Sequence, residues 1–126
     1  MQKNIVAAPQ LAEEGKQKIE GVKRNMPILR QIEDDFRKHQ YFSGLRVLVC
    51  IHLEAKTAYL AQVFAAGGAE VAVTGSNSHS TKDDVVAALA EEGMHVYARY
   101  GATPEEMRQY MNRALDVRPN IMIDDG

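Results

Sequence analysis

The apolar run Leu45-Arg46-Val47-Leu48-Val49-Cys50-Ile51 has the length and composition of one buried strand in a β-sheet. Residues 53–66 follow it, rich in Ala and Leu and without Pro or Gly, and they predict a helix. Gly67-Gly68 provides the usual C-terminal stop of that helix, and residues 70–74 read as a second strand. A strand, a helix and another strand in this order predict a right-handed crossover between two parallel strands.

The same alternation continues toward the C-terminus. Three further elements are a helix over 81–92, a strand over 94–98 and a strand over 120–123. We expect Ser80 or Thr81 to cap the first of these, and Thr103 with Glu106 to form the capping box of another helix before the last strand.

Two helices are predicted before the first strand. Residues 12–24 have few apolar side chains and read as an exposed helix, whereas a second helix follows Met26-Pro27. Its apolar residues recur at intervals of three or four and predict a stripe that faces a core: Ile28, Leu29, Ile32 and Phe36. We therefore expect an α/β fold, a doubly wound, Rossmann-like parallel sheet of about four strands in the order 3-2-1-4, with helices on both faces.

Composition excludes several classes of function. The 126 residues suffice for one domain, and the formal net charge of -2, without a dense Lys/Arg cluster, argues against nucleic acid or an anionic membrane as partner. The single cysteine cannot form an internal disulfide, and no metal-binding spacing of His and Cys is present. With no signal peptide or membrane-spanning run, the sequence predicts a cytoplasmic protein that binds a small molecule.

Polar residues cluster where the predicted strands end, which is where sheets of this type bind ligands. His52, Glu54, Lys56 and Thr57 place a base, an acid, a cation and a hydroxyl at the start of one helix; this is either a binding site or a solvated helix terminus. Asp124-Asp125 is either catalytic or a cap for a following helix. Asn77, in the loop after the second strand, shapes a turn or contacts a ligand.

A dinucleotide site is not expected in this domain. The loop that follows the first strand, residues 52–57, lacks the glycines that let a backbone approach a pyrophosphate. The second strand ends in Thr74-Gly75-Ser76-Asn77 rather than in the acid that binds a ribose.

Several separated motifs nevertheless resemble one enzyme family, the S-adenosylhomocysteine hydrolases. The matching segments run from about Leu11 to the last residue and have the family's order and spacing: Met26-Pro27-Ile28-Leu29, residues 51–58, residues 68–71, Ser76-Asn77 with residues 80–83, and residues 123–126. The resemblance implies a partial substrate-binding domain over residues 1–126 of an NAD-dependent enzyme that reversibly hydrolyses S-adenosylhomocysteine to adenosine and homocysteine. Full-length members are expected to be homo-oligomers.

The resemblance also assigns roles to residues. His52 matches the family's histidine beside the ribose and the leaving homocysteine, and Asp125 matches an active-site aspartate; both would be catalytic. Glu54, Lys56, Thr57 and Asn77 would bind substrate. Because Lys56 stands where many members have a glutamate or glutamine, and a lysine only donates, hypoxanthine competes with adenine as the base; Glu54 could still accept from the adenine amine.

Two alternatives therefore stand beside an adenosylhomocysteine hydrolase fragment: an S-inosylhomocysteine hydrolase fragment, and a nucleoside-binding module without catalysis. The family's remaining active-site lysine and aspartate and its NAD-binding domain have no counterpart in these residues. We therefore expect the chain alone to be inactive, with NAD bound by a domain that this chain lacks.

Overall fold

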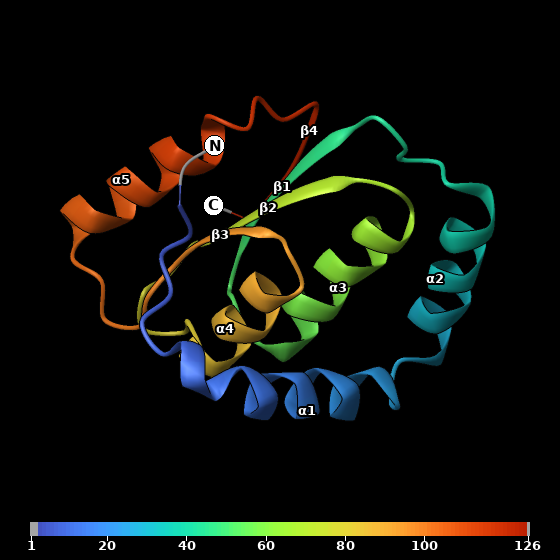
Figure 1. Cartoon of the computed structure of the whole chain (residues 1–126), viewed down its shortest axis with the longest axis horizontal. Coiled ribbons are helices and arrows are strands. Elements are labelled where there is room, and N and C mark those ends of the chain that lie inside the picture. Colours follow the sequence, from blue (N-terminus) through green and yellow to red (C-terminus); the bar gives the residue numbers. More distant parts are fainter. Residues whose placement is uncertain (1–2, 126) are drawn as a thin grey trace.

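Four parallel strands form the centre of the computed structural model, which describes residues 3–125 (Figure 1). They are β1 (Arg46–Ile51), β2 (Glu70–Gly75), β3 (His95–Tyr97) and β4 (Ile121–Asp124). Their order is β3-β2-β1-β4, which confirms the prediction and puts β1 and β4 side by side. The helices are a short 3-10 turn, Pro9–Leu11, followed by α1 (Ala12–Lys23), α2 (Pro27–His39), α3 (Ala55–Ala66), α4 (Asp83–Glu91) and α5 (Pro104–Leu115).

Helices cover both faces of the sheet, because alternate strand residues point to opposite sides. On one face the strands contribute valines to a core shared with α3 and α4: Val47, Val49, Val71, Val73 and Val96. On the other face Leu48, Ala72 and Tyr97 pack with Tyr110 and Ala114 of α5. The doubly wound α/β architecture is therefore confirmed.

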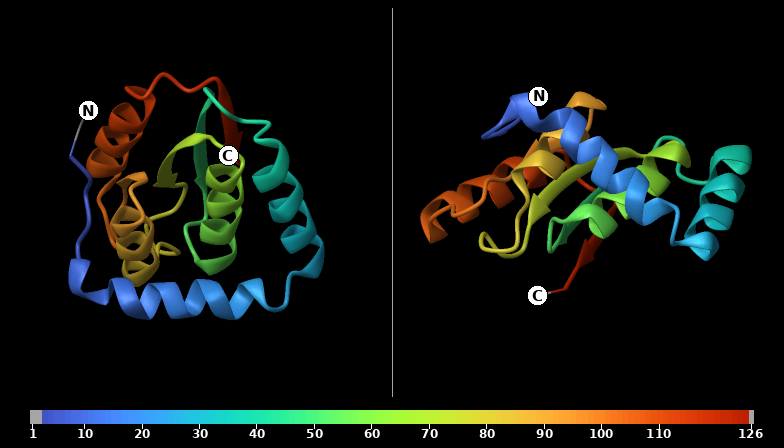
Figure 2. Two further views of the ribbon diagram at one scale, coloured as in Figure 1. Left: turned by 45° about the vertical axis from the view of Figure 1, so that its right-hand side comes forward. Right: turned by 90° about the horizontal axis from the view of Figure 1, so that it is seen from below.

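Helix α1 runs across the outer side of α3 and α4 (Figure 2). Its Gly15 lies so close to α4 that an added Cβ would be 1.9 Å from the Asp84 carbonyl oxygen. Ile19 is fully buried on the same side, and Lys18 forms an ion pair with the Asp84 carboxylate. The helix predicted as exposed thus has a buried face.

Helix α2 is held to α3 by a polar cluster rather than by a complete apolar stripe. The buried Glu33 accepts hydrogen bonds from the Tyr59 hydroxyl at 2.7 Å and from Arg37 Nη2 at 2.9 Å. Leu29 and Phe36 pack against the core as predicted, but Ile28 is 72% exposed and Ile32 is 39% exposed. The predicted core-facing stripe was therefore wrong for those two isoleucines.

The helix ends agree with the sequence in one case and differ in another. Thr103 and Glu106 form the predicted capping box at the start of α5. The N-cap of α4 is Lys82, which makes no side-chain cap bond, so the predicted cap by Ser80 or Thr81 was wrong. Both hydroxyls instead donate to the Asn77 carbonyl oxygen, at 3.1 and 3.0 Å.

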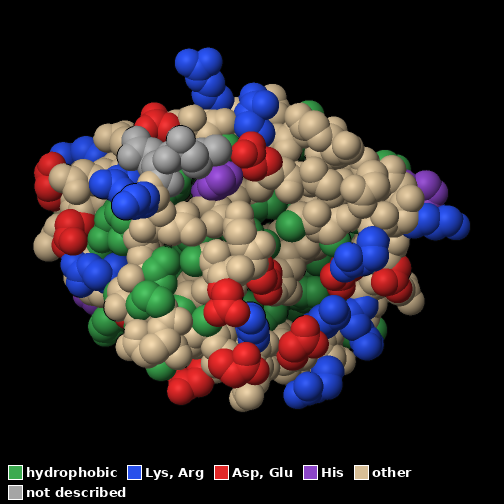
Figure 3. All heavy atoms as spheres, viewed as in Figure 1, with side chains coloured by type: hydrophobic (Ala, Val, Ile, Leu, Met, Phe, Trp, Pro, Cys, Tyr) green, Lys and Arg blue, Asp and Glu red, His purple; other side chains and the backbone are tan. Residues whose placement is uncertain are grey.

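Within residues 3–125, no helix is long and apolar enough to cross a membrane. No group of three or more His, Cys, Asp and Glu side chains in the described part of the chain could hold a metal ion. On the face shown in Figure 3, acidic and basic side chains are intermixed rather than gathered by sign.

Candidate functional site

His52 and Asp125 come together at the carboxyl edge of the sheet. Cys50 on β1 is the register partner of Asp124 on β4, so the residues that follow these strands leave the sheet side by side. His52 Nε2 lies 3.9 Å from Asp125 Oδ2, and the two side chains are about half exposed. The pair can therefore exchange protons with a ligand that occupies this edge.

A third residue, Ser80, completes this cluster from the neighbouring β2–α4 loop. Its Oγ lies 2.6 Å from His52 Nδ1, across 28 residues of sequence. This contact was not predicted from the sequence, because a hydroxyl at Ser80 fits a helix cap equally well. The available signal was topological: β2 lies beside β1, so the loop after β2 borders whatever follows β1.

Asn77 organises the β2–α4 loop. Its Oδ1 accepts from the His79 backbone N–H at 2.8 Å, and its carbonyl oxygen accepts the hydroxyls of Ser80 and Thr81. Gly75 is required beneath this loop, because an added Cβ would lie 2.8 Å from Thr81 Oγ1. The turn interpretation of Asn77 is therefore realised, and its exposed amide nitrogen is the group that a ligand could use.

The other predicted binding residues lie on the first turn of α3. Glu54 is the N-cap, and its Oε1 accepts from the Thr57 backbone N–H at 3.3 Å. Thr57 is buried, whereas Lys56 is exposed and Glu54 is partly exposed. Glu54 and Lys56 are thus the two members of this group with polar atoms that a ligand can reach.

Cys50 does not provide a nucleophile at this edge. Burial, with the negative charges of Asp124 and Asp125 in addition, raises the pKa of its thiol to about 11. The sulfur therefore remains a protonated, packed side chain near neutral pH.

The β1–α3 loop does not fit a dinucleotide cofactor. A pyrophosphate site uses free backbone N–H groups at the helix start, and here the Glu54 carboxylate already accepts from one of them, that of Thr57. A second negative group there would be repelled.

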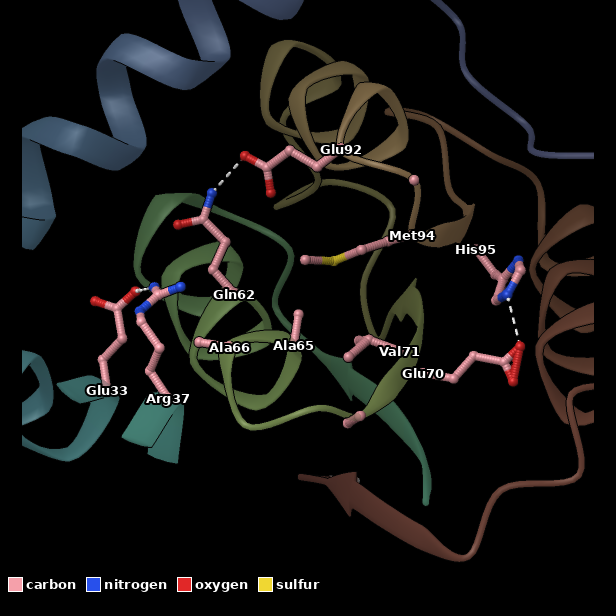
Figure 4. Close-up of a pocket in the computed structure, with 12 residues that line it drawn as sticks. Glu33, Arg37, Gln62, Ala65, Ala66, Glu70, Val71, Glu92, Met94 and His95 are labelled. Atoms are coloured by element: carbon pink, nitrogen blue, oxygen red, sulfur yellow. Dashed lines mark hydrogen bonds and ion pairs between the residues drawn. The ribbon is translucent and has the colours of Figure 1, made fainter. Parts of the chain in front are cut away.

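A cavity of about 430 Å³ lies at the opposite, amino edge of the sheet (Figure 4). Its walls include Gln62 from α3, Glu92 at the end of α4 and the first residues of β2 and β3. Three pairs of polar side chains already satisfy one another there: Glu33 with Arg37, Gln62 with Glu92, and Glu70 with His95 (Figure 4). We place the site at the carboxyl edge instead, because ligands bind there in parallel sheets and the polar groups converge there.

Comparison with known proteins matches the sequence of this chain to one family. The family model for S-adenosyl-L-homocysteine hydrolase matches residues 3–126. The chain is 53% identical over 116 residues to an adenosylhomocysteinase of Pyrococcus abyssi, in an alignment that covers 92% of this chain and 28% of that protein. It is 49% identical over 116 residues to an S-inosyl-L-homocysteine hydrolase of Methanocaldococcus jannaschii, with the same coverage of each chain. The chain therefore spans a little over a quarter of the length of these relatives.

Proposed function

Because the chain belongs to the S-adenosyl-L-homocysteine hydrolase family, we propose that it forms part of the substrate site of an enzyme that hydrolyses a purine-nucleoside thioether of homocysteine. The observation that supports this most is the meeting of His52 and Asp125, 3.9 Å apart, at the ligand-binding edge of the sheet.

Thioether hydrolysis needs a proton donor for the departing sulfur and a proton acceptor for the water that replaces it. Overall, the carbon–sulfur bond is replaced by a carbon–oxygen bond from water, and the departing sulfur takes up a proton. An imidazole changes its protonation state near neutral pH, and an adjacent carboxylate stabilises the imidazolium. In the proposed site His52 moves the proton and Asp125 balances its charge.

Two bases compete for recognition by the first turn of α3. Adenine is the first candidate, since the second carboxylate oxygen of Glu54 can accept from the exocyclic amine. Hypoxanthine is the second, favoured by the exposed Lys56, which can donate to a keto oxygen, and by the use of Glu54 Oε1 in the helix cap. Relatives with each named activity align with the chain at similar identity.

The NAD that the family resemblance implies would be bound by residues other than these. The Glu54 carboxylate at the start of α3 would repel a pyrophosphate group at this edge. We propose that these residues supply substrate binding and proton transfer, and that the oxidation chemistry belongs to another part of the enzyme.

Calorimetric titration of the chain with adenosine, inosine and S-adenosyl-L-homocysteine tests this function. We expect binding by the wild type, and at least tenfold weaker binding of S-adenosyl-L-homocysteine by His52→Ala. His39→Ala, on the exposed end of α2, is the matched control and should bind as the wild type does. Equal affinities in all three proteins would refute the site, and tight binding of adenosine without its thioether would favour the stand-alone binding module.

A further inference from the structure

The contact between Ser80 and His52 constrains which imidazole nitrogen carries a proton. Ser80 Oγ lies 2.6 Å from His52 Nδ1 and 3.1 Å from the Asn77 carbonyl oxygen. A serine hydroxyl has one proton to donate and two lone pairs that accept. The two contacts can therefore be satisfied together in only one way.

The Asn77 carbonyl oxygen can only accept, so its contact with Ser80 uses the hydroxyl proton. Thr81 Oγ1 donates to the same oxygen at 3.0 Å, and the Ser80 backbone N–H donates to it at 3.3 Å. Ser80 Oγ then presents a lone pair to His52 Nδ1, which must carry hydrogen to complete the bond. We propose that Ser80 is a positioning residue that holds His52 as the Nδ1–H tautomer and so makes Nε2 the nitrogen that exchanges protons. This inference rests on the proposed function of the site.

Asp125 faces the other ring nitrogen, Nε2. Its Oδ2 lies 3.9 Å from Nε2, on the side of the ring away from Ser80. A proton taken up at Nε2 would face a carboxylate, whereas Nδ1 stays committed to the loop. In a neutral imidazole the Asp125 carboxylate alone would favour hydrogen on Nε2, so the assignment depends on the closer contact with Ser80, at 2.6 Å against 3.9 Å.

The opposite arrangement makes a distinct prediction. If Ser80 donated to Nδ1, the Asn77 oxygen would keep Thr81 and the longer 3.3 Å contact from the Ser80 backbone N–H, and His52 would carry its hydrogen on Nε2. The two arrangements therefore differ in one measurable property, the tautomer of a single histidine.

Long-range proton–nitrogen NMR correlation of the ligand-free chain at about pH 8.5, where an ordinary histidine is neutral, reports that tautomer directly. We expect Nδ1–H to dominate in the wild type. Ser80→Ala should shift the tautomer ratio about fivefold toward Nε2–H, since one hydrogen bond is lost. Ser80→Thr keeps a hydroxyl and should restore the wild-type ratio.

Ser78→Ala, in the same loop, is the control and should leave the ratio unchanged. A dominant Nε2–H in the wild type, or an unchanged ratio in Ser80→Ala, would overturn the proposal. If Ser80 had only a structural role, Ser80→Ala would change the amide signals of the loop but not the tautomer ratio of His52. That result would also contradict the proposal. The NMR measurement uses the ligand-free chain, so its outcome does not depend on whether nucleosides bind in the calorimetric test. The two proposals can therefore fail separately.

Discussion

Cys50 and Asp124 are register partners on the adjacent strands β1 and β4, and this pairing places His52 against Asp125 just beyond the sheet. Parallel strands lie about 4.8 Å apart, so residues that leave neighbouring strands at the same edge can reach one small ligand. Between the end of β1 at Ile51 and the start of β4 at Ile121 lie 69 residues of sequence, yet the two strands are neighbours in the sheet. The strand order therefore creates the site.

Asp125→Asn should leave the fold almost unchanged. The side chains of Asp125 and His52 are both about half exposed, and exposed ion pairs contribute little to stability. We expect the free energy of unfolding in urea to change by less than about 0.5 kcal/mol, while binding of S-adenosyl-L-homocysteine weakens. A large loss of stability would show that the pair has a structural role.

Gly15→Ala should destabilise the chain by about 1 to 3 kcal/mol, because the added methyl group collides with the Asp84 backbone. Gly21→Ala, in the same helix, is the matched control: its nearest neighbour is the end of the Arg24 side chain at 3.8 Å. We expect that control to gain about 0.5 to 1 kcal/mol from helix propensity. Urea midpoints of the three proteins measure both changes, and equal effects of the two alanines would contradict the close packing of α1 on α4.

Cys50 gives the chain an alkaline pH dependence of stability. Its pKa is raised from 9.0 to about 11 in the fold by burial and by the charges of Asp124 and Asp125. A raised pKa favours the protonated thiol in the folded state, so its stabilising contribution is complete below pH 9 and is lost as the pH rises through 11.

Cys50→Ala should therefore lose less stability than the wild type between about pH 8 and 10.5. The stability of Cys50→Ala should still depend on pH, because burial also raises the pKa of Tyr59, whose hydroxyl donates to Glu33. Urea unfolding at both pH values provides the comparison. Parallel losses in the two proteins would mean that the thiol titrates as it does in the unfolded chain.

Lys56→Gln should change the preference between bases. If Lys56 donates to a keto oxygen, the variant should lose affinity for inosine about tenfold, the effect of one charged hydrogen bond, and keep its affinity for adenosine. Lys38→Gln, an exposed lysine on α2, is the control. If the ratio of the affinities for inosine and adenosine is the same in Lys56→Gln as in the wild type, Lys56 does not take part in base recognition.

The sequence predicted what depends on local patterns and on topology. Apolar runs and the glycine stop at Gly67-Gly68 defined β1 and α3, and the rule for crossovers indicated that the strands are parallel. The periodicity of α2 predicted an apolar stripe but not what covers it. Within the described residues nothing buries Ile28, which is 72% exposed.

Ser80 could not be assigned from the sequence for a different reason. A hydroxyl just before a helix is the usual N-cap signal, and that local expectation conceals a bond to a histidine on another loop. Glu54 shows the converse: it was singled out for ligand binding, and one of its oxygens also caps α3. Local sequence patterns do not predict side-chain roles that depend on tertiary contacts.

The location of the ligand is the central claim, and amide chemical-shift mapping with S-adenosyl-L-homocysteine tests it most directly. We predict that the shifts concentrate at the carboxyl edge, in residues 52–57, 76–81 and 124–125. His52→Ala should reduce them, and His39→Ala should not. Shifts centred on Gln62, Glu92 and His95 at the amino edge, or no saturable shifts at all, would contradict the site.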